Sequence, residues 1–399
     1  MKVLIWNDFI LKARKGGPTT YLYNLRESVK ANKIDNVTFL NNKEAKEKLV
    51  SSPKFTNFYK KHIVSNLFRL LKGKDFEAQN RKEKIIRRRT SHGKLPAEIN
   101  LDDYTHIHFH TTSAFYKNAH LLKDFKGKTL LTSHSPKATH MEVIEEFLSG
   151  IELNEDEKQK FEEVDRFSFE NADYVVFPCK EAQEPYFNSW DKYKDITLKN
   201  DVKEFLTCTL ESKITLSREE VFAKYNIPED AFVITYFGRH NEVKGYDILK
   251  ALGERILPKH KNVYFLLAGK EAPIVGLNHE RWIEVGWTQD PHSIVGASDL
   301  YILPNRETFF DLALLEVLSI GTVSLVSNTG GNKYFKRLPE EETKGMLFFD
   351  QNDLNDLEAK FNQVYSGSYS KEWNKELFEK YFNNSHFAPN YLKMIGELK

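Results

Sequence analysis

Residues 303–321, LPNRETFFDLALLEVLSIG, pass from the end of an apolar strand through a polar loop into an apolar helix. We expect this helix to begin near Asp311 and to be largely apolar from Leu312 onward. Glu316 lies among these apolar neighbours. A carboxylate in such a place is costly unless it is hydrogen-bonded, so Glu316 either faces solvent or binds a ligand such as a diol.

The same strand–loop–helix unit recurs along the chain. Apolar, β-branched or aromatic runs that favour strands alternate with helical patterns. This alternation is typical of parallel sheets covered by helices on both faces, in which ligands bind beyond the carboxyl ends of the strands. The expected strands are residues 3–6, 37–40, 106–110, 129–133 and 174–178 in the first half, and 232–238, 263–269, 282–285, 300–304 and 323–327 in the second.

The length of 399 residues predicts two domains, because one hydrophobic core organises roughly 100–200 residues. A polar, irregular segment at 199–216 separates the halves, and Ser217-Arg218-Glu219-Glu220 after it has capping-box spacing. We therefore predict an α/β protein of two Rossmann-like domains, residues 1–205 and 206–376, facing each other across a cleft. The last residues, 377–399, are expected to be helical.

Cysteine content and hydropathy exclude several classes of protein. Cys179 and Cys208 are the only cysteines and lie in no metal-ligand spacing, which excludes a disulfide framework or a cysteine-rich zinc site and fits a reducing compartment. No run of about 18 apolar residues occurs, and the apolar start of the chain ends at Asn7, so neither a membrane span nor a signal core is expected. We expect a cytoplasmic protein whose membrane contact, if any, is peripheral.

Three histidines, His106, His108 and His110, alternate along one expected strand and so share one face. They lack a carboxylate partner at a spacing that would suit a metal site. The chain also contains no Asp-any-Asp triplet. We therefore predict no metal ion and no other cofactor.

Positive charge is concentrated in residues 54–94, although the whole chain has a net charge of only +1, which predicts no nucleic-acid partner. This stretch holds thirteen Lys and Arg against Asp75, Glu77 and Glu83, and it contains Arg87-Arg88-Arg89. Apolar residues recur within it near helical spacing. Two interpretations stay open: a solvated helical surface, or a landing surface for anionic lipid headgroups or a phosphate-bearing acceptor.

A glycine-bearing loop follows the first strand of each half. Gly16 and Gly17 precede a helix, so backbone N–H groups there can approach a phosphate. Arg239 and Lys244 lie five residues apart on a loop that ends in Gly245. An Arg fork and a Lys point charge suit a pyrophosphate, although a simple turn and a solvated pair are the alternatives. Because both halves carry such a loop, a diphosphate held across the cleft is the economical interpretation.

In their order and spacing, the motifs of both halves resemble glycosyltransferase family 4, the retaining enzymes of the GT-B fold. The resemblance extends over nearly the whole chain. It implies that the first domain is the acceptor side, that the second binds a nucleotide sugar, and that helix 377–399 crosses back to the first domain. It rests on the glycine pair, Thr132-Ser133-His134, residues 170–176, Phe237-Gly238-Arg239 with Lys244-Gly245, residues 266–269, 285–287 and 297–299, the Glu316 helix and Thr329-Gly330-Gly331.

The resemblance also implies roles for single residues. Glu316 would hold the ribose hydroxyls of the donor, and His134 would face the donor sugar. The donor-binding residues are expected to be Gly16, Gly17, Arg239, Lys244, Thr308, Phe310, Glu316 and Gly330, and the catalytic ones His134, Glu307 and Asp311.

One departure from the family pattern affects the residue that contacts the sugar. Family members carry two glutamates with seven residues between them, whereas Glu307 and Glu316 enclose eight. Counting back from Glu316 puts Thr308 at the first glutamate position and Asp311 at the position of a glycine. Either the loop is re-registered so that Glu307 reaches the sugar, or Thr308 or Asp311 takes that role.

The activity expected from the resemblance is transfer of a hexose-type sugar, with retention and without a metal ion, from a UDP-sugar to a cell-envelope glycan, a lipid-linked acceptor or a protein, in bacterial polysaccharide synthesis. Arg239, Lys244 and the Gly16-Gly17 backbone would stabilise the charge on the leaving diphosphate. The alternatives are a catalytically quiet partner subunit, favoured by the altered glutamate spacing, and a sugar-nucleotide epimerase on the same fold.

Overall fold

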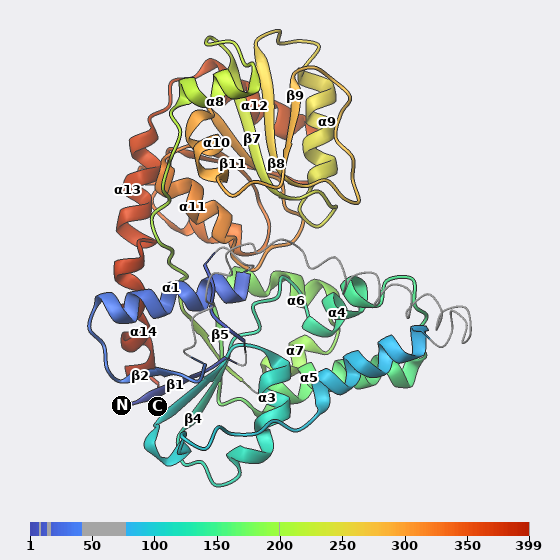
Figure 1. The fold of residues 1–399 in the computed structure, drawn as a ribbon, viewed down its shortest axis with the longest axis vertical. Coiled ribbons are helices and arrows are strands. Elements are labelled where there is room, and N and C mark those ends of the chain that lie inside the picture. Colours follow the sequence, from blue (N-terminus) through green and yellow to red (C-terminus); the bar gives the residue numbers. More distant parts are fainter. Residues whose placement is uncertain (8, 14–16, 42–76, 199, 399) are drawn as a thin grey trace, which may run out of the picture. The chain divides into compact units, whose positions relative to one another are not determined.

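The computed structural model describes residues 1–7, 9–13, 17–41, 77–198 and 200–398. The chain divides into two compact units (Figure 1). The first unit consists of Met1–Tyr23, Asp35–Val176 and Trp190–Lys203, and the second of Asn24–Ile34, Phe177–Ser189 and Glu204–Lys399.

The first sheet has six strands in the order β2-β1-β3-β4-β5-β6. Strand β1 pairs in parallel with both β2 and β3, and the parallel pairing continues from β3 through β4 to β5. Every residue of β1 and β5 is buried, as in sheets that helices cover on both faces. The strands are β1 (Val3–Trp6), β2 (Val37–Phe39), β3 (His106–Phe109), β4 (Lys128–Leu131), β5 (Tyr174–Phe177) and β6 (Asp201–Glu204).

Helices connect these strands. Residues 77–90 are helical as well, in the part of the chain before β3. The other helices up to β6 are α1 (Gly17–Ala31), α3 (Thr112–Asn118), α4 (Thr139–Phe147), α5 (Glu155–Asn171), α6 (Glu184–Ser189) and α7 (Tyr193–Thr197).

The second sheet also has six strands, in the order β12-β11-β10-β7-β8-β9, and all its neighbouring pairs are parallel. The strands are β7 (Phe232–Arg239), β8 (Val263–Lys270), β9 (Trp282–Gly286), β10 (Leu300–Leu303), β11 (Val323–Ser327) and β12 (Met346–Phe349). The helices of this part are α8 (Arg218–Tyr225), α9 (Tyr246–Ile256), α10 (Pro291–Ala297), α11 (Leu312–Ile320), α12 (Leu354–Ser366), α13 (Lys371–Tyr381) and α14 (Phe387–Gly396).

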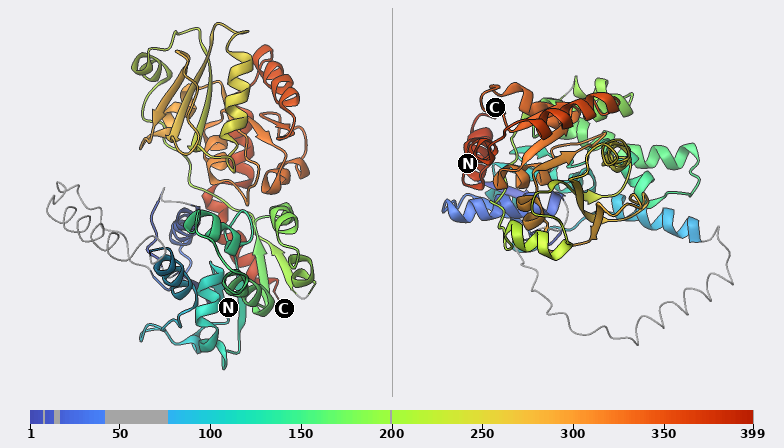
Figure 2. Two further views of the ribbon diagram at one scale, coloured as in Figure 1. Left: turned by 90° about the vertical axis from the view of Figure 1, so that its right-hand side faces the viewer. Right: turned by 90° about the horizontal axis from the view of Figure 1, so that it is seen from above.

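Alternate side chains of the second sheet enter different cores. Ile234 of β7 belongs to the larger core, which α9 and α12 contribute to, whereas its neighbour Val233 belongs to a core with α8 and α10. The same alternation occurs along β8 between Phe265 and Leu266. Successive residues of a strand point to opposite faces. Helices therefore cover both faces of this sheet, with α9 and α12 on one face and α8 and α10 on the other (Figures 1 and 2).

The prediction of two α/β domains built on parallel sheets is confirmed. The capping box at Ser217 is present, and Asp311 is the N-cap of α11 as expected. Two strands lie outside the expected set. One, β6, falls in the segment predicted to be irregular, because its residues are polar and largely exposed at the edge of the sheet. The other, β12, is an apolar run of four residues, Met346–Phe349, too short to distinguish a strand from a buried helical turn.

The C-terminal segment is not one helix over 377–399. It consists of α13 and α14, separated by a short 3₁₀ turn at Asn384–His386. The amide oxygen of Asn383 accepts a hydrogen bond from the backbone N–H of Ser385 (2.9 Å), which caps this turn. The prediction of a single helix is therefore wrong in its bounds.

The two compact units differ from the predicted division into residues 1–205 and 206–376. The C-terminal helices and the second half of α1 both belong to the second unit. A specific contact accounts for this: Ser28 of α1 donates its hydroxyl to the carbonyl of Asn384 (2.5 Å) and accepts from the backbone N–H of Ala388 (3.0 Å). The compact units do not test the domain boundaries, so the division into residues 1–205 and 206–376 remains a prediction.

Within the described ranges, no helix is both long enough and apolar enough to cross a membrane.

Candidate functional site

A lysine, an aspartate and an asparagine meet at the carboxyl ends of β7 and β10. The Nζ of Lys244 lies 2.7 Å from Oδ2 of Asp311. The side-chain amide of Asn305 donates to the same oxygen (2.8 Å). Parallel strands end at one edge of their sheet, so the β7–α9 and β10–α11 loops converge there. Two of these residues, Lys244 and Asp311, were among the predicted site residues.

The loop that carries Lys244 is held against the end of β10. Gly245 has φ +66°, and a Cβ at this position would lie 1.8 Å from the carbonyl oxygen of Pro304. The glycine is needed for both reasons, since other residues are strained at such a φ. Arg306 pins the same loop: its backbone N–H donates to Val243 (3.0 Å), and its guanidinium pairs with Asp247 in the first turn of α9.

Asp311 is fixed by its place at the start of α11. Its Oδ1 accepts from the backbone N–H of Ala313 (3.0 Å), as an N-cap does. Burial opposes ionisation of this carboxyl, but the charge of Lys244 and the hydrogen bonds from Lys244, Asn305 and Ala313 outweigh it, so the pKa of Asp311 is lowered. The carboxylate therefore faces Lys244 as an anion.

Glu316, five residues further along α11, has a protein partner. Its Oε2 lies 3.1 Å from Nε2 of His292, which is buried on α10. The Glu316 side chain retains 17% exposure. The sequence offered solvent or a ligand as the two surroundings of this carboxylate, and the structure adds a third, a buried histidine. His292 was missed because only its position after the strand 282–286 could have indicated a role.

The phenol of Tyr301 is a buried polar group on the strand that precedes Asp311. It is fully buried in β10, and its oxygen has no hydrogen-bond partner among the residues that the structure describes. Burial raises the pKa of Tyr301 above its ordinary value, and the charges of Asp311 and Glu316 add to this effect. Both carboxylates thus act electrostatically on one buried hydroxyl.

The remaining predicted residues of the β10–α11 region have different surroundings. Thr308 is buried, and its carbonyl lies against Gly330, which has φ +44°, and accepts from the N–H of Gly331 (3.2 Å). The ring of Phe310 stacks on Phe335 at 5.8 Å in an aromatic cluster. Glu307 is partly buried between Arg306 and Thr308.

Arg239 ends β7 and is exposed. The carbonyl of Arg239 accepts a hydrogen bond from the hydroxyl of Tyr236 (2.7 Å). Arg239 also lies opposite Lys270 of β8 in the register of the sheet. Arg239 thus lies at the same sheet edge as the Lys244 loop.

In the first unit, three histidines gather at the carboxyl ends of β3 and β4. Nδ1 of His110 lies 2.8 Å from Nε2 of His134, and the two rings stack. His108 is hydrogen-bonded through Nε2 to the hydroxyl of Thr132 (2.9 Å). Desolvation by the surrounding protein lowers the pKa of His108 and of His134 to about 3 each, so both are neutral near pH 7. The predicted absence of a metal site at His106, His108 and His110 stays a prediction.

The backbone of His134 is unusual, with φ +58°. A non-glycine residue in this region is strained by roughly 1–3 kcal/mol, and such strain clusters at functional sites. The ring of Tyr21 packs edge-on against His134 at 4.6 Å. The family resemblance, together with its position after a strand, singled out His134 in the sequence, but nothing there indicated that His110 would contact it.

The predicted glycine pair is only partly described. Gly17 is the exposed first residue of α1, and a Cβ there would meet nothing within 4 Å. Gly16 lies outside the described residues.

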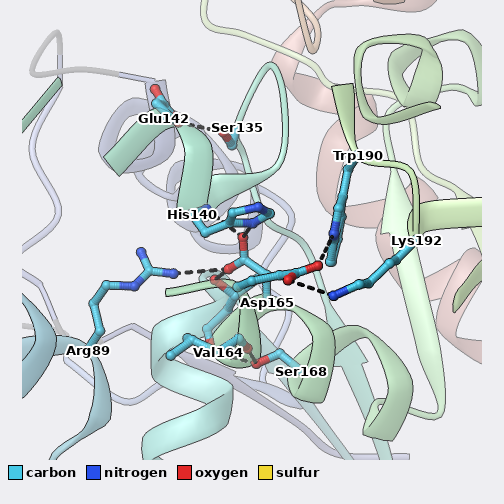
Figure 3. A network of polar contacts seen from close by, with 11 residues as sticks. Arg89, Ser135, His140, Glu142, Val164, Asp165, Ser168, Trp190 and Lys192 are labelled. Atoms are coloured by element: carbon cyan, nitrogen blue, oxygen red, sulfur yellow. Dashed lines mark hydrogen bonds and ion pairs between the residues drawn. The ribbon is translucent and has the colours of Figure 1, made fainter. Parts of the chain in front are cut away.

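The predicted basic stretch 54–94 is described from residue 77 onward. Arg87 and Arg88 are exposed on helix 77–90. Arg89 is not part of that surface: it is buried and pairs with the fully buried carboxylate of Asp165 on α5 (3.0 Å), as Figure 3 shows. The periodicity of a helix explains this, since Arg89 shares the inward face with Ile85 and Ile86, which pack on the core.

Residues 231–366 match the family model described as "Glycosyl transferases group 1". Among curated proteins, a glycogen synthase of Clostridium kluyveri is 29% identical over 142 residues, which are 32% of this chain and 30% of that protein. A UDP-Gal:alpha-D-GlcNAc-diphosphoundecaprenol alpha-1,3-galactosyltransferase of Escherichia coli is 35% identical over 85 residues, which are 21% of this chain and 20% of that protein. The chain thus spans less than a third of the length of these relatives.

Solved structures extend the similarity to the whole chain. The HepE protein of Anabaena, solved in complex with UDP, superposes with a TM-score of 0.61 at 13% identity, and the match covers 100% of both chains. At this identity the likeness shows the fold. The chain has the GT-B fold, and its residues 231–366 match the group 1 glycosyl transferase family model.

Proposed function

We propose that the protein is a retaining glycosyltransferase that moves a hexose-type sugar from a UDP-sugar to an acceptor of the cell envelope. The observation that carries the proposal is the cluster of Lys244, Asp311 and Asn305 beside the Glu316–His292 pair, at the carboxyl edge of the sheet within the matched domain. Ligands of open parallel sheets bind at this edge. The UDP complex of HepE supports a nucleotide donor.

The chemistry of the cluster suits a nucleoside diphosphate. Departure of the diphosphate from the sugar leaves negative charge on phosphate oxygens, and fixed cations and N–H groups aimed at that charge lower the barrier. Lys244 and Arg239 would supply the cations. Glu316, oriented by His292, would accept hydrogen bonds from the ribose hydroxyls. No metal ion is then required, and full activity in the presence of a chelator is expected.

The residue that contacts the sugar differs from the family pattern. Thr308, at the first glutamate position, is buried against Gly330, which leaves Glu307 and Asp311 as the carboxylates of this loop. His134 belongs to the other unit, and its place opposite the sugar rests on the resemblance alone. Its neutral imidazole and its strained backbone support a functional role.

The acceptor is proposed to be a cell-envelope glycan, a lipid-linked sugar or a protein. The E. coli relative acts, by its name, on a diphosphoundecaprenol-linked sugar. The exposed Arg87 and Arg88 would suit such an acceptor, whose diphosphate lies at a membrane surface. We propose a cytoplasmic protein with peripheral contact to anionic membranes.

The decisive experiment incubates the purified protein with a panel of UDP-, GDP- and ADP-sugars and measures hydrolysis or transfer of the sugar. Release of the nucleoside diphosphate from one donor supports the proposal. A change in the sugar without its release would identify an epimerase. No reaction with any donor, together with tight nucleotide binding, would favour the second candidate, a catalytically quiet subunit. The presence of Thr308 and Asp311 in place of the family residues supports this candidate.

A further inference from the structure

The ammonium group of Lys244 is already engaged by an anion of the protein itself. The Lys244–Asp311 distance of 2.7 Å is that of a charge-assisted hydrogen bond. The side chain of Lys244 is 29% exposed and that of Asp311 only 10%. The lysine is therefore open to solvent on one side and occupied by the carboxylate on the other.

The carboxylate is held in place by groups other than Lys244. Asn305, which is fully buried, donates to Oδ2, and the backbone N–H of Ala313 donates to Oδ1. These contacts attach Asp311 to the end of β10 and to the first turn of α11. A rigid anion thus lies beside the lysine that the proposed function assigns to phosphate.

The charge of Asp311 is not needed for its role as the N-cap of α11. An N-cap requires a side-chain oxygen that accepts from the helix, and Asn and Ser serve as well as Asp. The negative charge therefore has its main effect on Lys244 and on whatever approaches Lys244. An incoming phosphate meets the attraction of the lysine and the repulsion of the carboxylate together.

We propose that Asp311 is an internal counter-ion of Lys244 that stands in for a donor phosphate, so that a nucleoside diphosphate binds only by drawing Lys244 away from it. Asp311 then sets the affinity of the site for its donor. The inference rests on the proposed function, because it takes Lys244 to be a phosphate ligand.

The test measures UDP binding by isothermal titration calorimetry with the full chain and three variants: Asp311→Asn, Lys244→Met and the double variant. Asn keeps an oxygen for the N-cap and the shape of the side chain, and it removes the charge. In place of Oδ2 it presents an amide NH₂ group to Lys244 and Asn305, so Asp311→Ser is measured beside it. We expect Asp311→Asn to bind UDP roughly tenfold more tightly, since the attraction of Lys244 is no longer offset.

The double variant gives a second, independent signature. If Lys244 must leave Asp311 when UDP binds, breaking the ion pair offsets part of the attraction between Lys244 and UDP in the wild type. In the Asp311→Asn protein there is no ion pair to break. Lys244→Met should therefore reduce UDP affinity by a larger factor in the Asp311→Asn background than in the wild type. Equal factors in both backgrounds would contradict the inference.

Asp299→Asn is the matched control. Asp299 directly precedes β10, at the opposite end of the strand, and pairs with Arg218 through both oxygens (3.0 and 3.1 Å). The substitution removes the same charge from an ion pair of the same unit, and UDP affinity should stay unchanged. Asp311→Ser, which also caps a helix, decides the result if Asp311→Asn unfolds at a lower temperature than the wild type.

The outcomes separate the inference from the proposed function. If the wild type binds UDP, and Asp311→Asn and Asp311→Ser bind it equally or more weakly, the counter-ion role is wrong while the donor assignment stands. If Asp299→Asn tightens binding as much as Asp311→Asn does, the effect belongs to overall charge, and the inference is wrong. If none of the proteins binds UDP, GDP or ADP, the proposed donor and the inference fall together.

Discussion

At the scale of the residue, the structure gives Glu316 a protein partner, His292, that the sequence did not indicate. We expect Glu316→Ala to weaken nucleotide-sugar binding by about 1.5–3 kcal/mol, the contribution of hydrogen bonds to a charged group. Because His292 loses its acceptor, stability should fall as well, by about 1 kcal/mol. Calorimetric titration with the donor and urea unfolding measure the two effects separately.

Glu220→Ala serves as the control for this experiment. It removes one half of the capping box that starts α8, so it should lower stability without changing donor affinity. A donor dissociation constant unchanged in Glu316→Ala would refute the ribose assignment.

The two basic residues of the β7–α9 region support a prediction about rate. Lys244→Ala and Arg239→Ala should each raise the barrier to transfer by about 2–4 kcal/mol, the range seen when one donor to a developing anion is removed. The measurement is kcat with a saturating donor, with and without a chelator. Lys224→Ala on α8, which removes a lysine from the same unit, should leave kcat unchanged. Near-wild-type rates in both variants would mean that the phosphate charge is stabilised elsewhere.

The sequence identified most of these residues by type and position, but not their pairings. Lys244 was indicated by its loop after a strand, Glu316 by its apolar neighbours on a helix, and Asp311 by the family resemblance. Asn305 and His292 were not predicted, because a single Asn or His belongs to no motif with a recognisable spacing. The contact of His292 on α10 with Glu316 on α11 joins residues 24 positions apart, and no local sequence pattern indicates it. The fold was predictable because periodic apolar residues are local, whereas the partner of a buried carboxylate depends on tertiary packing.

At the scale of the element, Asp165 joins four segments of the first unit. Besides Arg89 of helix 77–90, it accepts hydrogen bonds from Thr112 at the start of α3 (2.7 Å) and from the backbone and ring of His140 in α4 (2.6 and 2.9 Å) (Figure 3). Removing one partner of a buried ion pair costs about 3–5 kcal/mol. We expect Asp165→Asn to destabilise the protein by this amount at pH 7, as measured by urea unfolding.

The pH dependence of that difference has a definite sign. Burial raises the pKa of Asp165, but His140, Arg89 and Thr112 outweigh it, so the folded-state pKa is lowered below 3.8. A lowered pKa contributes stability that is fully present above the unfolded-state pKa, about 3.9, and is lost as pH falls through the folded-state value. The difference between wild type and Asp165→Asn should therefore shrink in strong acid, as pH falls below the unfolded-state value of about 3.9 toward the folded-state one.

Glu163→Gln is the control, because Glu163 forms a half-exposed pair with Arg166 within the same helix, α5. It should change stability by less than about 1 kcal/mol at any pH. A difference between wild type and Asp165→Asn that grows as pH falls would contradict the assignment of Asp165 as an ionised, buried anchor.

At the scale of the whole molecule, the exposed Arg87 and Arg88 allow the proposed membrane contact to be tested. Arg87→Gln with Arg88→Gln should reduce flotation with vesicles of anionic lipid, and the binding should weaken as salt rises, because exposed charges are screened over about 8–10 Å. Arg89 is left unchanged, since its substitution would break the buried pair with Asp165. Donor hydrolysis should not change.

Lys158→Gln with Lys160→Gln is the matched control, because it removes two exposed positive charges from the acidic helix α5. If wild type and the Arg87/Arg88 variant float equally with anionic and neutral vesicles, the stretch 54–94 is better interpreted as a solvated helical surface.

The segments that make up the second unit have a consequence for recombination. The unit draws Glu181 and Glu184 from residues 177–189, where they pair with Arg337 and Lys333 of the 3₁₀ helix Gly330–Arg337, and it draws Ser28 from α1. A chimera joined at residue 205 would take residues 1–205 from one relative and the rest from another. Arg337, Lys333 and the turn at Asn384 would then lose the partners that they have in this chain. An exchange of sugar specificity between relatives, in evolution or in the laboratory, would therefore have to transfer three separate stretches of the chain together.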